Sequence, residues 1–289
     1  MNIKKVCIVG SGMMGSGIAQ VSAQAGLSVS LCDISLQMLE KARNSIKSSL
    51  TKFAEKGKIK EDVNTVMSRI KTSTDYEIAD ADLVIEAVFE DIKLKHEVLK
   101  KISSLASAKT IIASNTSAIP ISRLAVATSC PEQFLGLHFF SPVPMMMTVE
   151  VIRGLSTTEK VLQFGADFVR LVGKEPLLVH RDIAGFVLNR INMLTNIEAA
   201  RLVEQGVATP EDIDKGVRLA FGRKMGPFET TDMVGLDVQL MAYTNVYEEE
   251  KEMRFYPPSI LRQKVYAGHL GRKTGKGWYE YNPDGTRKK

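Results

Sequence analysis

The amino-acid sequence predicts an α/β fold, with a doubly wound sheet followed by a smaller all-α domain. Two observations carry this prediction. In the first 183 residues, short apolar runs alternate with segments whose apolar residues recur every three or four positions, as strands and helices do. From residue 184 onward only the helical pattern remains. The 289 residues are enough for two domains, which we place at residues 1–183 and 184–289.

The elements of the first domain are predicted in order along the chain. Apolar runs indicate strands, and the three- and four-residue periodicity indicates the helices between them. The strands are expected at residues 6–9, 27–32, 82–87, 110–114, 134–140, 148–152 and 177–179. The helices are expected up to residue 25, at 36–53, around 63–67, at 92–105 and at 159–171.

Glycine and proline residues delimit the helices expected in the second domain. The first opens at Gly185 and runs to Glu204, and the second follows Pro210. A third begins near Glu229 and is ended by the proline pair at 257–258, before a short helix at 259–267. Residues 278–281 are expected to form a terminal strand or hook.

The composition is that of an ordinary globular protein, with 44% hydrophobic and 25% charged residues and a net charge of +5. No apolar run approaches the roughly 18 residues of a membrane span, so no membrane partner is expected. No stacking aromatic residues are interleaved with the lysines of residues 41–60, which argues against nucleic acid. Three scattered cysteines without CxxC spacing indicate reduced thiols in a cytoplasmic protein, and no metal site is expected.

A glycine-rich turn follows the first predicted strand. Its residues Gly10, Gly12 and Gly15 have the GxGxxG spacing, and a helix, a second strand and an acidic residue follow in order. This is the dinucleotide-binding fingerprint of a Rossmann-type sheet. The turn, including Met13 and Met14, is expected to contact the pyrophosphate at the helix N-terminus.

Asp33 ends the second predicted strand, 23 residues after Gly10. A carboxylate there would accept hydrogen bonds from the adenosine ribose and repel a 2′-phosphate, so NAD is favoured over NADP. The alternative is that Asp33 only caps the helix that starts near Leu36.

His138 ends an apolar run that is typical of a buried strand, and Glu150 lies twelve residues further on. A carboxylate bonded to one imidazole nitrogen would fix the tautomer and leave the other nitrogen to exchange protons. In isolation, the alternative of a core histidine bonded to a backbone carbonyl is more common.

Further polar residues are expected where open α/β sheets bind ligands, at the carboxyl ends of strands. They are Glu90 and the segment 114–117 (Ser-Asn-Thr-Ser), although the segment could merely cap the next turn. Residues 41–60 carry seven basic residues against one glutamate. This patch is either a solvated helix face or a surface that contacts phosphates.

Seven blocks of the sequence resemble, in this order, those of the L-3-hydroxyacyl-CoA dehydrogenases, particularly the bacterial 3-hydroxybutyryl-CoA dehydrogenases. They lie at residues 10–20, 114–117, 136–140, 149–151, 185–190, 225–228 and 271–275. The resemblance implies hydride transfer between NAD(H) and C3 of a (3S)-3-hydroxyacyl-CoA, with a short-chain substrate expected. It implies His138 as general base, Glu150 as the carboxylate that orients it, and Ser117 and Asn189 as partners of the reacting oxygen. It also implies cofactor contacts by Glu90, Lys95, Ser117, Ser141 and Lys273.

The sequence departs from the family pattern in three places. Ser141 stands where the family usually has asparagine, and Met147 where it often has lysine. Around residues 44–52 the match is loose, so Lys52 and Lys56 are assigned to coenzyme A only on the charge of their patch.

The second domain is expected to close the site and to form a homodimer, because its helices are rich in apolar residues. An ordinary monomer core is the alternative. Two other functions stay open at this stage: a related two-domain dehydrogenase acting on a hydroxy acid without coenzyme A, and a non-catalytic NAD-binding protein.

Overall fold

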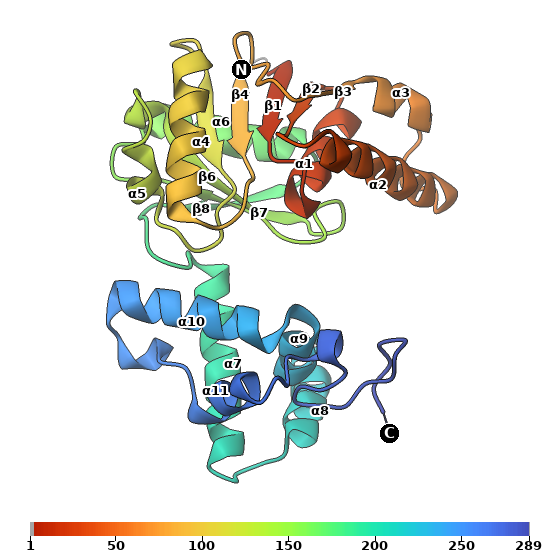
Figure 1. The fold of residues 1–289 in the computed structure, drawn as a ribbon, viewed down its shortest axis with the longest axis vertical. Coiled ribbons are helices and arrows are strands. Elements are labelled where there is room, and N and C mark those ends of the chain that lie inside the picture. The colour runs from red at the N-terminus through yellow and green to blue at the C-terminus, as the bar shows by residue number, and fades with distance from the viewer. Residues whose placement is uncertain (1–2, 289) are drawn as a thin grey trace. The chain divides into compact units, whose positions relative to one another are not determined.

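The computed structural model describes residues 3–288, which divide into two compact units between Phe186 and Val187 (Figure 1). The first unit is a sheet with flanking helices and the second is helical. The predicted fold class is confirmed. No helix within residues 3–288 is long and apolar enough to cross a membrane.

The sheet of the first unit has eight strands in the order β3-β2-β1-β4-β5-β6-β7-β8. Neighbouring strands are parallel except β6 and β7, which form an antiparallel pair. The first six strands have the order of a dinucleotide-binding sheet, whose switch point lies between β1 and β4. The strands are β1 (Lys5–Val9), β2 (Ser28–Cys32), β3 (Ile70–Ser73), β4 (Leu83–Glu86), β5 (Ile111–Ser114), β6 (Phe134–Phe139), β7 (Thr148–Ile152) and β8 (Glu175–Val179).

Six helices flank this sheet: α1 (Met13–Gln24), α2 (Leu36–Glu55), α3 (Val63–Ser68), α4 (Ile92–Leu105), α5 (Ile121–Ala125) and α6 (Glu159–Leu171). Buried side chains of α1, α2 and α6 share one apolar core with the sheet. The buried residues of α4 and α5 lie outside this core, and Figure 1 shows α4 in front of the sheet. Helices therefore cover both faces, as a doubly wound sheet requires.

One strand and one α-helix of the first unit were not predicted from the sequence. The edge strand β3 buries only Ile70 and so lacks the apolar run that marks the inner strands. The helix α5 is a single five-residue turn after Pro120, too short to show a period.

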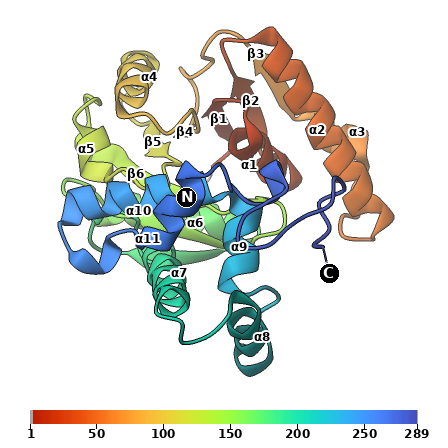
Figure 2. The same cartoon turned by 60° about the horizontal axis from the view of Figure 1, so that its bottom comes forward.

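The second unit consists of α7 (Leu188–Glu204), α8 (Pro210–Phe221), α9 (Pro227–Val234), α10 (Leu236–Glu250) and α11 (Ser259–Tyr266). Figures 1 and 2 both show α10 beside α11. The single helix expected from Glu229 to the proline pair is wrong. It is divided at Gly235, whose φ of +111° is incompatible with a helix, and α10 ends at Glu250.

One further boundary in this part of the chain differs from expectation, and one alternative that the sequence left open is resolved. α7 begins at Leu188 rather than Gly185, because Gly185 and Phe186 both have positive φ. Residues 278–281 form a hook with isolated bridges, not a strand. The N–H groups of Trp278 and Tyr279 are bound by the carboxylate of Asp232, at 2.9 and 3.0 Å, and so are not available for a strand ladder.

Candidate active site

Two of the three fingerprint glycines are required by the packing of the turn after β1. Gly10 has a φ of +107°, and a Cβ there would lie 2.5 Å from the carbonyl oxygen of Ala87. A Cβ on Gly15 would lie 1.8 Å from the carbonyl oxygen of Gly10. The turn thereby packs the start of α1 against the ends of β1 and β4, at the switch point of the sheet.

Gly12 has a different environment. A Cβ on Gly12 would meet no atom within 4 Å, and its φ of −62° suits any residue. The protein's own packing therefore does not require glycine at position 12, whereas close approach of a pyrophosphate would. Met13 and Met14 follow in the first turn of α1, where N–H groups lack helical partners and favour anions. These features fit a dinucleotide phosphate.

We expect Gly12→Ala to weaken NADH binding by about tenfold or more, equivalent to about 1.4 kcal/mol, without lowering the melting temperature. The added methyl group would occupy the space through which the pyrophosphate reaches the backbone. Calorimetric titration with NADH and a thermal melt measure the two effects. Gly216→Ala is the matched control, because a Cβ there also meets nothing within 4 Å. Unchanged NADH affinity in Gly12→Ala would exclude this turn as the pyrophosphate site.

Asp33 follows β2 and is bonded to the glycine turn. Its Oδ2 accepts hydrogen bonds from the backbone N–H and the hydroxyl of Ser11, both at 2.8 Å. The N-cap of α2 is Ser35, whose hydroxyl accepts from the N–H of Met38. Asp33 is therefore not the N-cap itself, although its Oδ1 accepts the N–H of Ser35 at 3.1 Å. The contact of Asp33 with an adenosine ribose stays a prediction.

His138 and Glu150 form a buried pair on the β6–β7 hairpin. They are register partners in an antiparallel ladder, so their side chains lie on the same face of the sheet. Nδ1 of His138 is 2.6 Å from Oε2 of Glu150, and the two residues are 4% and 0% exposed. The rings of Phe140 and Phe186 lie 4.4 and 5.6 Å from the imidazole. Nδ1 is thus bonded to a carboxylate, which leaves Nε2 for proton exchange.

Ser117 lies in the turn after β5 and is held by Glu90. Oε1 of Glu90 accepts hydrogen bonds from the N–H and the hydroxyl of Ser117, at 2.8 and 3.2 Å. Burial alone would raise the pKa of the Glu90 carboxyl group. The charge of Lys95 and the hydrogen bonds from residues 116–118 outweigh burial, so this pKa lies below its usual value. The turn is also joined to β6, because Oδ1 of Asn115 accepts the N–H of Phe139 at 3.0 Å.

Lys95 is buried in α4, with its ammonium group 2.8 Å from Oε1 of Glu86 and 3.3 Å from Oε2 of Glu90. A direct contact of Lys95 with the cofactor stays a prediction. Glu86, which is fully buried, was not singled out from the sequence. The sequence does contain a signal that could have identified Glu86, namely a glutamate at the end of the apolar strand Leu83–Glu86. A carboxylate buried there needs a charged or hydrogen-bonding partner.

The remaining predicted residues are placed as follows. The hydroxyl of Ser141 donates to Sδ of Met13 at 3.1 Å, which joins the end of β6 to the start of α1. In the second unit, Asn189 is the second residue of α7. Lys273 donates to Oδ2 of Asp237 at 2.7 Å. The cofactor and substrate contacts of all three stay predictions.

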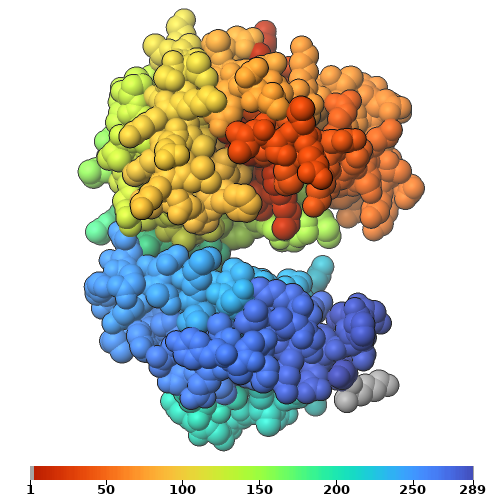
Figure 3. Space-filling view, viewed as in Figure 1, coloured from red at the N-terminus to blue at the C-terminus, as the bar shows by residue number. Residues whose placement is uncertain are grey.

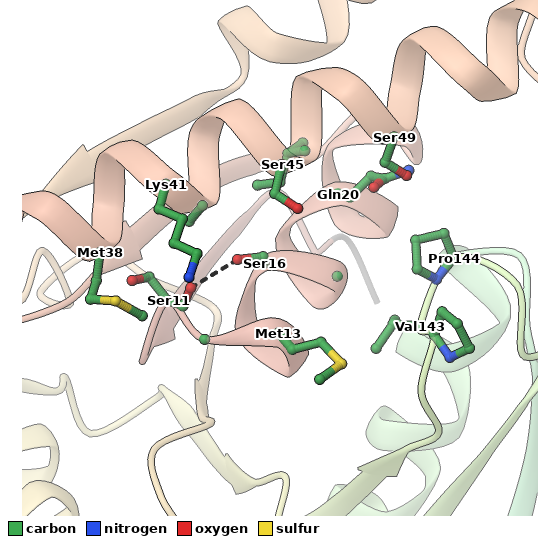
Figure 4. A pocket seen from close by; sticks show the side chains of 15 residues that line it. Ser11, Met13, Ser16, Gln20, Met38, Lys41, Ser45, Ser49, Val143 and Pro144 are labelled. Atoms are coloured by element: carbon green, nitrogen blue, oxygen red, sulfur yellow. Dashed lines mark hydrogen bonds between the residues drawn. The ribbon is translucent and has the colours of Figure 1, made fainter. Parts of the chain in front are cut away.

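Two pockets lie along α2. The first, of about 360 Å³, is bounded by the glycine turn, α2 and residues 142–144 (Figure 4). In Figure 4, Lys41, Ser45 and Ser49 of α2 face this space opposite Val143 and Pro144. The second, also of about 360 Å³, is lined by Lys52, Lys56 and Lys58 together with Ser45, Ser48, Ser49, Phe53 and Met145. Basic side chains and hydroxyl groups of α2, and of the residues just after it, therefore line both pockets.

Comparison with known proteins identifies both units. The family model for the 3-hydroxyacyl-CoA dehydrogenase NAD-binding domain matches residues 5–183, and that for the C-terminal domain of the same enzymes matches residues 185–281. A probable 3-hydroxybutyryl-CoA dehydrogenase of Deinococcus radiodurans is 41% identical over 96% of this chain and all of its own length. Human mitochondrial hydroxyacyl-coenzyme A dehydrogenase is 41% identical over 96% of this chain and 91% of its own length.

Solved structures give the same result. The (S)-3-hydroxybutyryl-CoA dehydrogenase of Ralstonia eutropha is 41% identical to this chain, with a TM-score of 0.94 over 97% of this chain and 100% of the other. Both units are thus matched by sequence and by fold. The chain belongs to the 3-hydroxyacyl-CoA dehydrogenase family, and it is an NAD-dependent oxidoreductase.

Proposed function

We propose that the protein interconverts short-chain (3S)-3-hydroxyacyl-CoA and 3-ketoacyl-CoA, with His138 as the acid–base residue. The observation that carries the proposal is the bond between Nδ1 of His138 and the buried carboxylate of Glu150. The short-chain preference is supported by relatives named 3-hydroxybutyryl-CoA dehydrogenase, which match nearly all of the chain.

The roles of the side chains follow from this pair. Bound NAD supplies the hydride chemistry. In the oxidising direction, Nε2 of neutral His138 accepts the proton of the C3 hydroxyl group, and Glu150 stabilises the imidazolium that forms. In the reducing direction, protonated His138 donates the proton back to the keto oxygen. Ser117 and Asn189 are assigned to this oxygen, where donors that are already oriented stabilise developing charge.

The test is oxidation of NADH with acetoacetyl-CoA by the purified protein, followed at 340 nm. We expect turnover with acetoacetyl-CoA, lower kcat/KM with C8 and C16 substrates, and lower kcat/KM with NADPH because of Asp33. Turnover of free keto acids but not of 3-ketoacyl-CoA would favour the dehydrogenase without coenzyme A. Absence of turnover with binding of NADH would indicate a non-catalytic protein.

We further propose that the ADP moiety of coenzyme A binds along α2. Lys52 and Lys56 line the second pocket there, and both side chains are exposed. Their charges suit a ligand that carries a pyrophosphate and a 3′-phosphate. The helix forms part of the surface of the first unit, in the orange region of Figure 3.

The double variant Lys52→Ala/Lys56→Ala is expected to raise KM for acetoacetyl-CoA about tenfold with little change in kcat. The reason is that the phosphate contacts stabilise the bound substrate and the transition state equally, so their loss weakens binding and not the chemical step. KM for the N-acetylcysteamine thioester, which has no phosphates, should stay the same. Lys100→Ala, an exposed lysine of α4, is the matched control. An equal increase in KM for both thioesters would contradict a phosphate contact.

We also propose a cytoplasmic homodimer formed through the second unit. Exposed apolar side chains gather on that unit, including Leu219 and Phe221 of α8, which are 76% and 74% exposed. Met233 and Met241, of α9 and α10, are also more than half exposed. Apolar surface of this kind is typical of an interface. The three free cysteines are consistent with a reducing compartment.

Light scattering at micromolar concentration is expected to give twice the chain mass of 31.9 kDa. Leu219→Glu/Phe221→Glu should shift the mass toward the monomer, because it places charge in an apolar interface. Leu155→Glu, at an exposed apolar residue of the first unit, is the control. A mass of one chain for the unsubstituted protein would exclude the dimer.

A further inference from the structure

Three charged side chains form a connected cluster at the carboxyl ends of β4 and β5. Glu86 ends β4, Glu90 lies in the following loop, and Lys95 is in the first turns of α4. The side chains of Glu86 and Lys95 are 0% and 1% exposed, and that of Glu90 is 29% exposed. We refer to these three residues as the triad. Ionised groups are rarely this deeply buried unless each has a partner of opposite charge. Two carboxyl groups that share one ammonium group are therefore unusual.

The hydrogen bonds of the triad define its charge. The carboxylate of Glu86 receives three donors: the N–H of Val88 at 2.7 Å, the hydroxyl of Ser114 at 2.6 Å and the ammonium group of Lys95 at 2.8 Å. Both oxygens thus act as acceptors, as those of a carboxylate do, and one of them pairs with the ammonium group. The ammonium group of Lys95 donates to Glu86 and to the carbonyl oxygen of Val88, and it forms an ion pair with Glu90 at 3.3 Å.

Glu90 supplies the second negative charge. Its Oε1 accepts from the hydroxyl of Thr116 at 2.6 Å and from the N–H groups of Ser117 and Ala118 at 2.8 and 3.0 Å. Two carboxylates and one ammonium group give the triad a net charge of −1. Glu86 determines this value, because without it Lys95 would neutralise Glu90.

The triad lies at the edge of the sheet that carries His138. Ser114 of β5 and Gly136 of β6 are register partners, and both strands continue in parallel to the turn at 115–118 and to His138. The hydrogen bond between Asn115 and Phe139 holds this turn beside β6. The triad therefore lies at the same edge of the sheet as the turn at 115–118 and His138, where the proposed function places the hydride exchange.

We propose that Glu86 is a specificity-determining residue for the oxidation state of the cofactor. The nicotinamide ring is cationic in NAD+ and neutral in NADH, while the rest of the cofactor is unchanged. A fixed negative charge near the ring therefore lowers the Kd for NAD+ relative to that for NADH, whereas contacts with the common part affect both equally. The proposal rests on the proposed function, since it places the ring beside His138.

The test measures Kd for NAD+ and for NADH by calorimetric titration without substrate, and uses the ratio of the two. Glu86→Gln makes the triad neutral and should raise the ratio Kd(NAD+)/Kd(NADH) about threefold to tenfold. This change is equivalent to about 0.7–1.4 kcal/mol. Lys95→Met removes the positive charge of the triad and should lower the ratio. Glu86→Gln/Lys95→Met restores −1 and should return the ratio to within about twofold of the unsubstituted protein.

Ser114→Ala is the matched structural control, because it removes a hydrogen bond to Glu86 without changing charge, and it should leave the ratio unchanged. The proposal is overturned if Glu86→Gln leaves the ratio unaltered, or if the double variant keeps the ratio of Glu86→Gln. If Glu86→Gln does not fold, the ratio Kd(NAD+)/Kd(NADH) of Lys95→Met is compared with that of the double variant. Equal ratios in these two variants would also overturn the proposal. Failure of the acid–base assignment is detected separately, because it concerns turnover and not these binding ratios.

Discussion

Replacing His138 with alanine is expected to lower kcat for the reduction of acetoacetyl-CoA by about 10²–10⁴, the usual contribution of a general acid–base residue. The substitution removes the Nε2 atom that exchanges the proton. Kd for NADH should stay within about twofold, because the contacts assigned to the pyrophosphate and to the adenosine ribose lie on the glycine turn and at Asp33, and the substitution removes neither. Steady-state kinetics and calorimetric titration with NADH measure the two quantities.

Loss of NADH binding together with turnover would instead identify His138 as a structural residue. The alanine variant leaves Glu150 buried without its imidazole partner, which is costly and could unfold the protein. His138→Asn is therefore the second variant, because its amide can still donate to Glu150 and yet cannot exchange a proton. It should be as inactive as the alanine variant and nearly as stable as the unsubstituted protein. His96→Ala, at a helix residue bonded to the carbonyl oxygen of Arg123, should keep full activity.

The sequence was most informative where a local pattern has one physical cause. Gly10 and Gly15 were predictable because their spacing fits only a tight turn against a strand, and the structure shows the backbone contacts that exclude a Cβ. The inner strands were predictable because both of their faces are buried. The strand β3, with one buried residue, and the break at Gly235 gave no periodic signal.

The site was less predictable where it depends on pairing between distant segments. Glu150 was proposed from the sequence as the partner of His138, and the antiparallel register of β6 and β7 explains why the two side chains meet. Glu86 was missed, since its partners Lys95 and Ser114 come from another helix and another strand. A sequence shows that a carboxylate ends an apolar strand, but tertiary structure determines which charge it meets.

Glu150→Gln is expected to lower kcat for acetoacetyl-CoA by about 10–10³ while leaving Kd for NADH unchanged. Glutamine has the shape of glutamate, and its amide oxygen can still accept the N–H at Nδ1 of His138. It lacks the negative charge that stabilises the imidazolium, and its NH₂ group can instead face Nδ1 and favour the wrong tautomer. Because His138 is protonated on only one side of the reaction, this interaction differs between ground and transition states, so kcat should change more than KM.

The controls for this variant separate charge from fold. Glu175→Gln removes an exposed carboxylate from β8, the strand next to β7, and should not affect kcat. The thermal melt of Glu150→Gln measures the cost of changing a buried group, and kinetics well below that melting temperature isolate the catalytic effect. A decrease in kcat of less than about threefold in the folded variant would show that the carboxylate does not assist His138. A normal kcat with a strongly lowered melting temperature would assign Glu150 to the stability of the β6–β7 hairpin, since a buried carboxylate bonded to a neutral imidazole can serve packing alone.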